Sequence, residues 1–334
     1  MTETQLSTYG LDRPESGDDV VVPFTLETLD ARGRIVRLGS SLDAILNRHN
    51  YPAPVARLLG EAVVLAALIG SSLKFQGKFI LQTQTDGPVN LLVVDLDAPD
   101  GLRGYARFDA DAVLQAVERG ETQPGQLLGR GHLAMTVDQG NHMERYQGIV
   151  ALEGGSLEDV AHTYFQQSEQ IPTLVRLAVA QHTKRGDRRP HWRAGGALVQ
   201  FLPPHGQSQM PDLPGDGNFD NPETADPDFV EDDKWTTTRA LLLTVADDEL
   251  ADPDLSGERL LFRLFHEQGV RVFDPVSLEE RCTCSAERIE AMLRDNFSAD
   301  DRAEMLVDGE IEVVCEFCSA DYHFKLHEFD DTQH

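Results

Sequence analysis

The feature that most constrains this chain of 334 residues is the placement of its four cysteines. All four lie in the last 53 residues, as a Cys-x-Cys pair (Cys282, Cys284) and a Cys-x-x-Cys pair (Cys315, Cys318). A tetrahedral zinc site of four thiolates needs two close pairs of this kind, because each pair supplies two ligands from one turn and the fold joins the pairs. We therefore predict that these four cysteines bind one Zn²⁺.

The same spacing leaves other interpretations open. The thiols could be ordinary buried cysteines, or they could form a zinc knuckle with a purely structural role. The single spacer between Cys282 and Cys284 would strain a disulfide between them, and strained disulfides are the labile, regulatory ones. Each pair could thus either bind metal or oxidise within itself.

The sequence around the cysteines predicts a small α+β unit. Ser285 and Ser298 are placed to cap two helices, the first running to about Asp295. Residues 311–315 and 322–326 are expected to pair as a hairpin, with the second cysteine pair at its turn. A unit of about 60 residues with little apolar core is only marginally stable without a disulfide or a bound metal. We therefore expect loss of zinc to unfold this unit.

The negative charge of the chain is concentrated in its C-terminal part. The whole chain has 29 Lys and Arg against 57 Asp and Glu, a net charge of −28. Residues 1–202 contribute a net −5 and residues 203–334 a net −23. Phosphate backbones and anionic lipid surfaces require clustered basic residues, so we expect neither nucleic acid nor membrane as a partner.

Residues 1–202 have the pattern of an α+β domain. Residues 78–85 and 89–97 are predicted strands joined by the turn signal Asp86-Gly87-Pro88, and residues 173–182 and 196–202 are further strands. The apolar run 58–73 is too short to span a bilayer comfortably and is predicted to be a buried core helix. The first residues lack the basic and apolar regions of a secretory signal, so we expect a cytoplasmic protein whose thiols are kept reduced.

The chain changes character at residue 203. Residues 203–234 hold six prolines and nine acidic residues with few aliphatic side chains, which predicts a flexible linker. Helical periodicity returns at 235–250 and 257–266, and Gly269 is a predicted helix stop. We predict three parts: a domain at 1–202, a linker region at 203–274 and a zinc-binding unit at 275–334. We further expect the apolar faces of both helices to lie against the first domain and to become free on oxidation.

Several motifs together resemble the 33 kDa chaperonin family of redox-regulated holdase chaperones. The segment Cys-Thr-Cys-Ser-Ala-Glu-Arg at 282–288 is similar to the first cysteine motif of that family, and Asp308-Gly309-Glu310-Ile311 leads into Cys315-Glu-Phe-Cys318 as in that family. Upstream, Tyr164-Phe165 with Ser168-Glu169-Gln170-Ile171-Pro172-Thr173 also matches. The acidic segment 203–234 is longer than usual, and the loop 184–193 is unusually basic.

The resemblance implies an ATP-independent holdase with a zinc-bound, inactive reduced form. Oxidation would form the disulfides Cys282–Cys284 and Cys315–Cys318, release the zinc and unfold the switch unit and the linker. The activated protein, a homodimer in that family, would hold unfolding client proteins. Only the four cysteines receive functional roles from this comparison.

An enzyme is the main competing class. The sequence contains no phosphate-binding loop, no dinucleotide fingerprint and no His-Glu-x-x-His motif. Four thiolates would also close the metal shell, whereas a catalytic zinc keeps one position open. His323 and His327 could replace a thiolate, but their strand spacing favours surface or packing roles. The alternative function is a thiol–disulfide oxidoreductase that uses Cys315 and Cys318, although that motif normally opens a helix.

Overall fold

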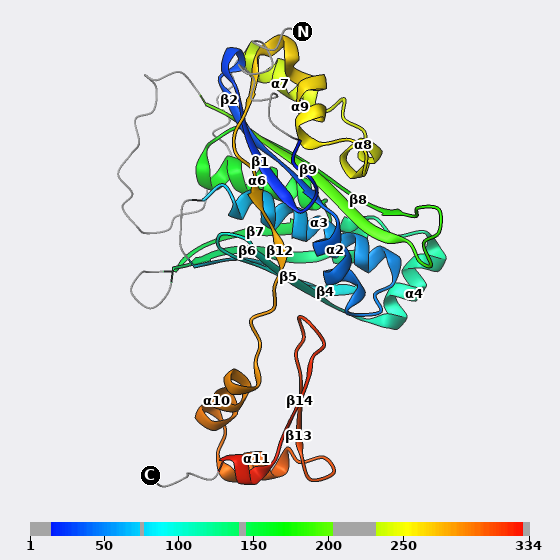
Figure 1. Ribbon diagram of the computed structural model, residues 1–334, viewed down its shortest axis with the longest axis vertical. Coiled ribbons are helices and arrows are strands. Elements are labelled where there is room, and N and C mark those ends of the chain that lie inside the picture. The colour runs from blue at the N-terminus through cyan, green and yellow to red at the C-terminus, as the bar shows by residue number, and fades with distance from the viewer. Residues whose placement is uncertain (1–14, 74–76, 140–144, 203–231, 330–334) are drawn as a thin grey trace.

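The computed structural model describes residues 15–73, 77–139, 145–202 and 232–329. Two large sheets enclose a layer of helices, and further helices cover the outer face of one sheet (Figure 1). A small C-terminal unit projects from one end of this body (Figure 1). The predicted α+β class is confirmed. Most of the predicted flexible linker, residues 203–231, lies outside the described residues.

The first sheet has the strand order β10-β1-β2-β9-β8, and β11 also pairs with β1. All its pairs are antiparallel. Its strands are β1 (Val20–Leu26), β2 (Ala31–Leu38), β8 (Thr173–His182), β9 (His191–Phe201), β10 (Val270–Val272) and β11 (Val276–Ser277). Both faces of this sheet are buried, since Val36 belongs to the main core and its neighbour Ile35 to a second core on the other side.

The second sheet has the order β12-β5-β4-β3-β6-β7. Its strands are β3 (Lys78–Thr85), β4 (Val89–Asp97), β5 (Gly101–Phe108), β6 (Arg130–Asp138), β7 (Tyr146–Glu153) and β12 (Glu279–Glu280). The predicted β3 and β4 strands are confirmed residue for residue. Every pair is antiparallel except β12 with β5, which is parallel. The chain therefore returns to this sheet immediately before the first cysteine pair.

Helix α3 fills the space between the two sheets (Figure 1). Residues on every side of this helix are buried, which explains why its sequence is apolar all round. Among the described residues it is long and apolar enough to cross a membrane, but 78% of it is buried inside the fold, as predicted for a core helix. The helices of this body are α2 (Ser40–Asn47), α3 (Ala53–Gly70), α4 (Ala110–Arg119), α5 (Pro124–Leu128) and α6 (Leu157–Tyr164), with short turns η1 (Glu27–Leu29) and η2 (Phe165–Glu169).

Three helices, which we call the linker helices, cover the outer face of the first sheet (Figure 1): α7 (Asp233–Leu242), α8 (Asp247–Ala251) and α9 (Gly257–Phe265), followed by the turn η3 (His266–Gln268). Their buried side chains form the second core with strands β1, β2 and β9. The expectation that these apolar faces lie against the first domain is confirmed. The prediction of one helix over 235–250 is wrong, because the chain turns at 243–246 and Ala246 starts a new helix whose first turn is capped by Glu249.

The C-terminal unit, residues 282–329, contains α10 (Ala286–Asn296), α11 (Ala299–Glu304), the hairpin β13 (Ile311–Val314) and β14 (Asp321–Phe324), and the turn η4 (Leu326–Phe329). Ser285 and Ser298 cap α10 and α11 as predicted. Only four side chains of its described residues form a buried apolar cluster: Leu293, Ile311, Phe324 and Phe329. A core of this size gives the unit little stability of its own.

Strand β9 begins at His191, five residues before the predicted start at Gly196, so the end of the predicted basic loop 184–193 is strand. The cause is Asp43 of α2, whose carboxylate accepts hydrogen bonds from Trp192 N (2.9 Å) and Arg189 Nη2 (2.8 Å) and lies 3.0 Å from His191 Nδ1. Burial alone would raise the pKa of Asp43, but these hydrogen bonds, Arg189 first, lower it to about 2. The buried carboxylate therefore fixes the start of β9 against α2.

Replacing Asp43 by Asn should destabilise the body by about 1–3 kcal/mol at pH 7, because the buried N–H of Trp192 and the guanidinium of Arg189 lose a charged acceptor. Since the folded pKa lies below the unfolded value of about 4, the stabilisation from Asp43 is complete above pH 4 and is lost as the pH falls towards 2. The variant should therefore lose less stability than the wild type over that interval. Thermal unfolding at pH 7 and from pH 4 to 2 checks this, with D111N, at an exposed position of α4, as control. An acid profile of D43N identical to that of the wild type would refute the assignment.

Candidate metal centre

The fold brings the sulfur atoms of all four cysteines together. Their Sγ atoms all lie within 4.8 Å of one another. The shortest separations are 3.3 Å from Cys282 to Cys284, 3.3 Å from Cys284 to Cys318 and 3.7 Å from Cys282 to Cys315. Zn–S bonds of about 2.3 Å in a tetrahedron place sulfurs about 3.8 Å apart, whereas a disulfide would hold them about 2 Å apart. The four are therefore free thiols that lie close enough together to bind one metal ion.

The first pair is held between a strand and a helix. Strand β12 pairs with β5 through Glu279 N to Asp100 O (2.9 Å) and Arg281 N to Leu102 O (2.8 Å), which fixes the chain one residue before Cys282. After Cys284, Ser285 accepts a hydrogen bond from Arg288 N and starts α10. The two sulfurs thus come from a short extended segment anchored at both ends.

The second pair lies in the turn of the β13–β14 hairpin. Cys315 N donates to Ala320 O (3.0 Å) and Ser319 N donates to Cys315 O (2.8 Å), so the turn is closed by the main chain. Ser319 has a φ of 55°, in the left-handed region. This turn is the predicted knuckle, and it does not open a helix as the Cys-x-x-Cys of an oxidoreductase does.

The thiols differ in acidity. Burial alone would raise the pKa of Cys284, but a hydrogen bond from Tyr322 Oη (3.1 Å) and those from the neighbouring thiols lower it to about 7. Burial raises the pKa of Cys282 and of Cys318. Cys284 therefore becomes a thiolate more readily than Cys282 or Cys318. The thiolate is the form of cysteine that binds metals and acts as a nucleophile.

These residues fit a zinc ion. The metal-binding cluster in the described part of the chain contains only thiols, the soft donors that select Zn²⁺ in a tetrahedral site. His323 Nδ1 lies instead 3.4 Å from Glu310, and His327 is exposed, so neither completes the group. Four sulfurs close the coordination shell, and this donor set suits a structural ion, because a catalytic ion needs an open position.

The hairpin turn also contacts the body of the protein. Phe317 lies between Cys315 and Cys318 and contacts two residues of β5. The Cζ atom of Arg103 lies 3.9 Å from the centroid of the Phe317 ring, and the Tyr105 ring lies edge-on to it with 4.9 Å between the centroids. Ser319 Oγ lies 3.0 Å from His49 Nδ1. Neither the contact of Phe317 nor that of the Tyr322 hydroxyl was predicted from the sequence. The aromatic residue inside Cys-x-x-Cys was the available signal for Phe317, whereas the Tyr322 contact depends on how the hairpin packs.

Comparisons with known proteins show the family of this chain. The model of the Hsp33 protein family matches residues 19–325. The chain belongs to the Hsp33 family. A 33 kDa chaperonin from Caulobacter vibrioides is 49% identical over 315 residues, covering 92% of this chain and 96% of the relative. One from Ectopseudomonas mendocina is 36% identical over 304 residues, covering 90% of each.

A solved Hsp33 structure shows that the fold itself is shared. The crystal structure of the 33 kDa chaperonin from Thermotoga maritima has a TM-score of 0.70 and 20% identity, and covers 93% of this chain and 97% of its own. The Hsp33 relatives are named chaperonins, which supports a chaperone over an enzyme. The cysteine cluster lies at the C-terminal end of the region that the Hsp33 family model matches.

Proposed function

We propose that this protein is a redox-regulated, ATP-independent holdase that prevents the aggregation of unfolding proteins. The observation that carries the proposal is the gathering of four thiols into one site within a unit that has only a four-residue described core. Cys282, Cys284, Cys315 and Cys318 would hold one Zn²⁺, which when bound cross-links the two halves of the unit. In this proposal the zinc-bound, reduced protein is inactive.

Oxidation removes the ligands. Within each pair, two thiolates give up two electrons to an oxidant such as hydrogen peroxide, which takes up two protons and leaves as two water molecules. The products are the disulfides Cys282–Cys284 and Cys315–Cys318. The distances do not select this pairing, because sulfurs of different pairs are about as close as those within a pair. The pairing is therefore taken from the family resemblance. A disulfide sulfur is a poor metal ligand, so the cross-link is lost.

The consequence follows from the size of the C-terminal core. Structural zinc contributes on the order of 10–16 kcal/mol to folding in small domains, which the C-terminal core cannot replace. The unit then unfolds, and the strong negative charge of residues 203–334 favours the expanded state. In this proposal the linker helices, which precede the unit in the chain, leave the first sheet when the unit unfolds. The apolar outer face of the first sheet, with Phe24, Val199 and Phe201, becomes available to clients.

The remaining expectations belong to the same proposal. The partners are unfolded or partly folded client proteins, the oxidised form is a homodimer, and neither ATP, nucleic acid nor a membrane is required. The protein acts in the cytoplasm and is not an enzyme. Its parts are the chaperone domain at 1–202, the linker region at 203–274 and the switch unit at 275–334. Strands β10 and β12, on either side of the last boundary, pair with the two large sheets.

An aggregation assay tests this function. A thermally unfolding client is incubated without ATP, with either the reduced, zinc-loaded protein or the peroxide-oxidised protein. We expect suppression by the oxidised form and little by the reduced form, and restored inactivity after reduction in the presence of zinc. Equal suppression of client aggregation by both forms would contradict the redox switch and indicate a constitutively active holdase. Disulfide reduction of a test substrate without any suppression would favour the oxidoreductase alternative.

A further inference from the structure

The short helix α8 is held on the first sheet at both ends by arginines that donate to main-chain carbonyls in the helix or next to it. At its N-terminal end, Arg176 of β8 donates to Val245 O (3.2 Å) and to Asp247 Oδ1 (2.7 Å). At its C-terminal end, Arg193 of β9 donates to Ala251 O (3.3 Å) and Arg37 of β2 donates to Asp252 O. Cations at these carbonyls also complement the negative end of a helix.

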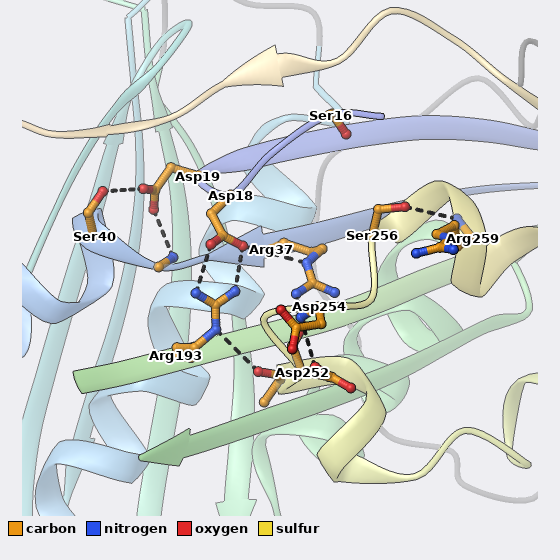
Figure 2. Close-up of polar contacts among 12 residues, drawn as sticks. Ser16, Asp18, Asp19, Arg37, Ser40, Arg193, Asp252, Asp254, Ser256 and Arg259 are labelled. Atoms are coloured by element: carbon orange, nitrogen blue, oxygen red, sulfur yellow. Dashed lines mark hydrogen bonds and ion pairs between the residues drawn. The ribbon is translucent and has the colours of Figure 1, made fainter. Parts of the chain in front are cut away.

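The carboxylate of Asp18 holds in place the two arginines that contact the C-terminal end of α8. Figure 2 shows the two terminal nitrogens of Arg193 directed at Asp18, with Arg37 beside them and the turn at Asp252 below. Arg193 makes two hydrogen bonds to Asp18, of 2.7 and 2.5 Å, and Arg37 Nε lies 3.7 Å from Asp18 Oδ1. The side chains of Arg37 and Arg193 are only 5% and 11% exposed, so their charges depend on this partner.

Helix α8 packs very closely on β9, but one of the arginine nitrogens beside it lacks a hydrogen-bond partner. A Cβ atom on Gly195 of β9 would lie 2.0 Å from Leu250 O, so the close approach of α8 requires glycine there. In the described part of the chain, Arg37 Nη1 is buried without a hydrogen-bond partner. The folded arrangement therefore carries a desolvation cost that is relieved when α8 leaves the sheet.

We propose that Asp18, Arg37 and Arg193 form an arginine latch that positions α8 on the sheet and sets how readily the linker helices are released. The arginines of the latch donate to the main-chain carbonyls of Ala251 and Asp252. These carbonyls lie within reach only while α8 is folded and packed on the sheet. The three residues are positioning residues. The claim that release of the linker helices activates the chaperone rests on the proposed function. The claim that the latch keeps α8 on the sheet does not depend on that function.

The test uses the full-length, reduced and zinc-loaded protein and measures hydrogen exchange by mass spectrometry. In D18N we expect protection of residues 243–265 to fall roughly tenfold or more, while strands β2 and β9 keep theirs. G195A, which leaves the charges intact and pushes on Leu250 O, should show the same pattern. R259Q is the matched control, because Arg259 lies on α9 and its ion pair with Glu15 is exposed.

The second readout is aggregation suppression without oxidant, which we expect to appear in D18N and G195A at unchanged zinc content. Linker protection in both variants equal to that of R259Q would overturn the latch. So would a uniform loss of protection across both sheets, because the cluster would then support only the body. Released linker helices without any suppression would keep the latch and contradict the proposed function.

Discussion

Stripping zinc from the reduced protein with a strong chelator is expected to unfold the C-terminal unit and leave the two large sheets folded. The reason is the imbalance between a cross-link of about 10 kcal/mol or more and a described core of four buried apolar side chains. C284S and C318S should have the same effect without a chelator. Hydrogen exchange measures it: residues 286–324 should lose protection, and strands β2, β3 and β9 should keep theirs.

The matched control for the ligand variants is Tyr322→Phe. It keeps the ring and removes only the hydroxyl that donates to Cys284 Sγ. This variant should retain its metal and the protection of the C-terminal unit. A chelated protein in which β13 and β14 stay protected would show that the hairpin folds without the metal, and the proposed switch would lose its physical basis.

The second large effect is expected from Phe265→Ala. Phe265 is fully buried in the second core, where its ring lies 6.3 Å from that of Phe24. Truncating a buried Phe to Ala costs about 3–5 kcal/mol. Because the linker helices are held mainly by this core, the loss falls on their docking. Reduced F265A should therefore show exposed linker helices and suppress client aggregation without oxidant.

Leu243→Ala provides the comparison for that variant. Leu243 directly follows the last residue of α7 but is 51% exposed, so its truncation removes apolar surface without opening the core. We expect L243A to behave as the wild type in hydrogen exchange and in the aggregation assay. If F265A released the helices and stayed inactive, the covered face of the first sheet would not be the client surface.

The parts of the fold that the sequence predicts are those with strong local signals. The turn at Asp86-Gly87-Pro88 delimits β3 and β4, the serines at 285 and 298 cap their helices, and the apolar run after Pro54 is buried on all sides. Each of these is determined within about 20 residues of chain. Local propensity and periodicity suffice in such cases.

The parts that escaped prediction depend on distant partners. Strands β10, β11 and β12 have only two or three residues, and they exist because edges of β1 and β5 are free to pair with them. The break between α7 and α8 coincides with the Arg176 contact to Val245 O. The cysteine cluster itself was predictable, because two close cysteine pairs are the sequence pattern that a four-cysteine site needs.

The central claim is that the four thiols hold one metal ion and release it when they are oxidised. Native mass spectrometry, combined with thiol counting on the same samples before and after peroxide, tests it most directly. We predict one zinc and four free thiols per reduced chain, and no zinc and two disulfides, one within each cysteine pair, per oxidised chain. Reduced protein without stoichiometric zinc, or zinc that stays bound after all four thiols are consumed, would contradict the account.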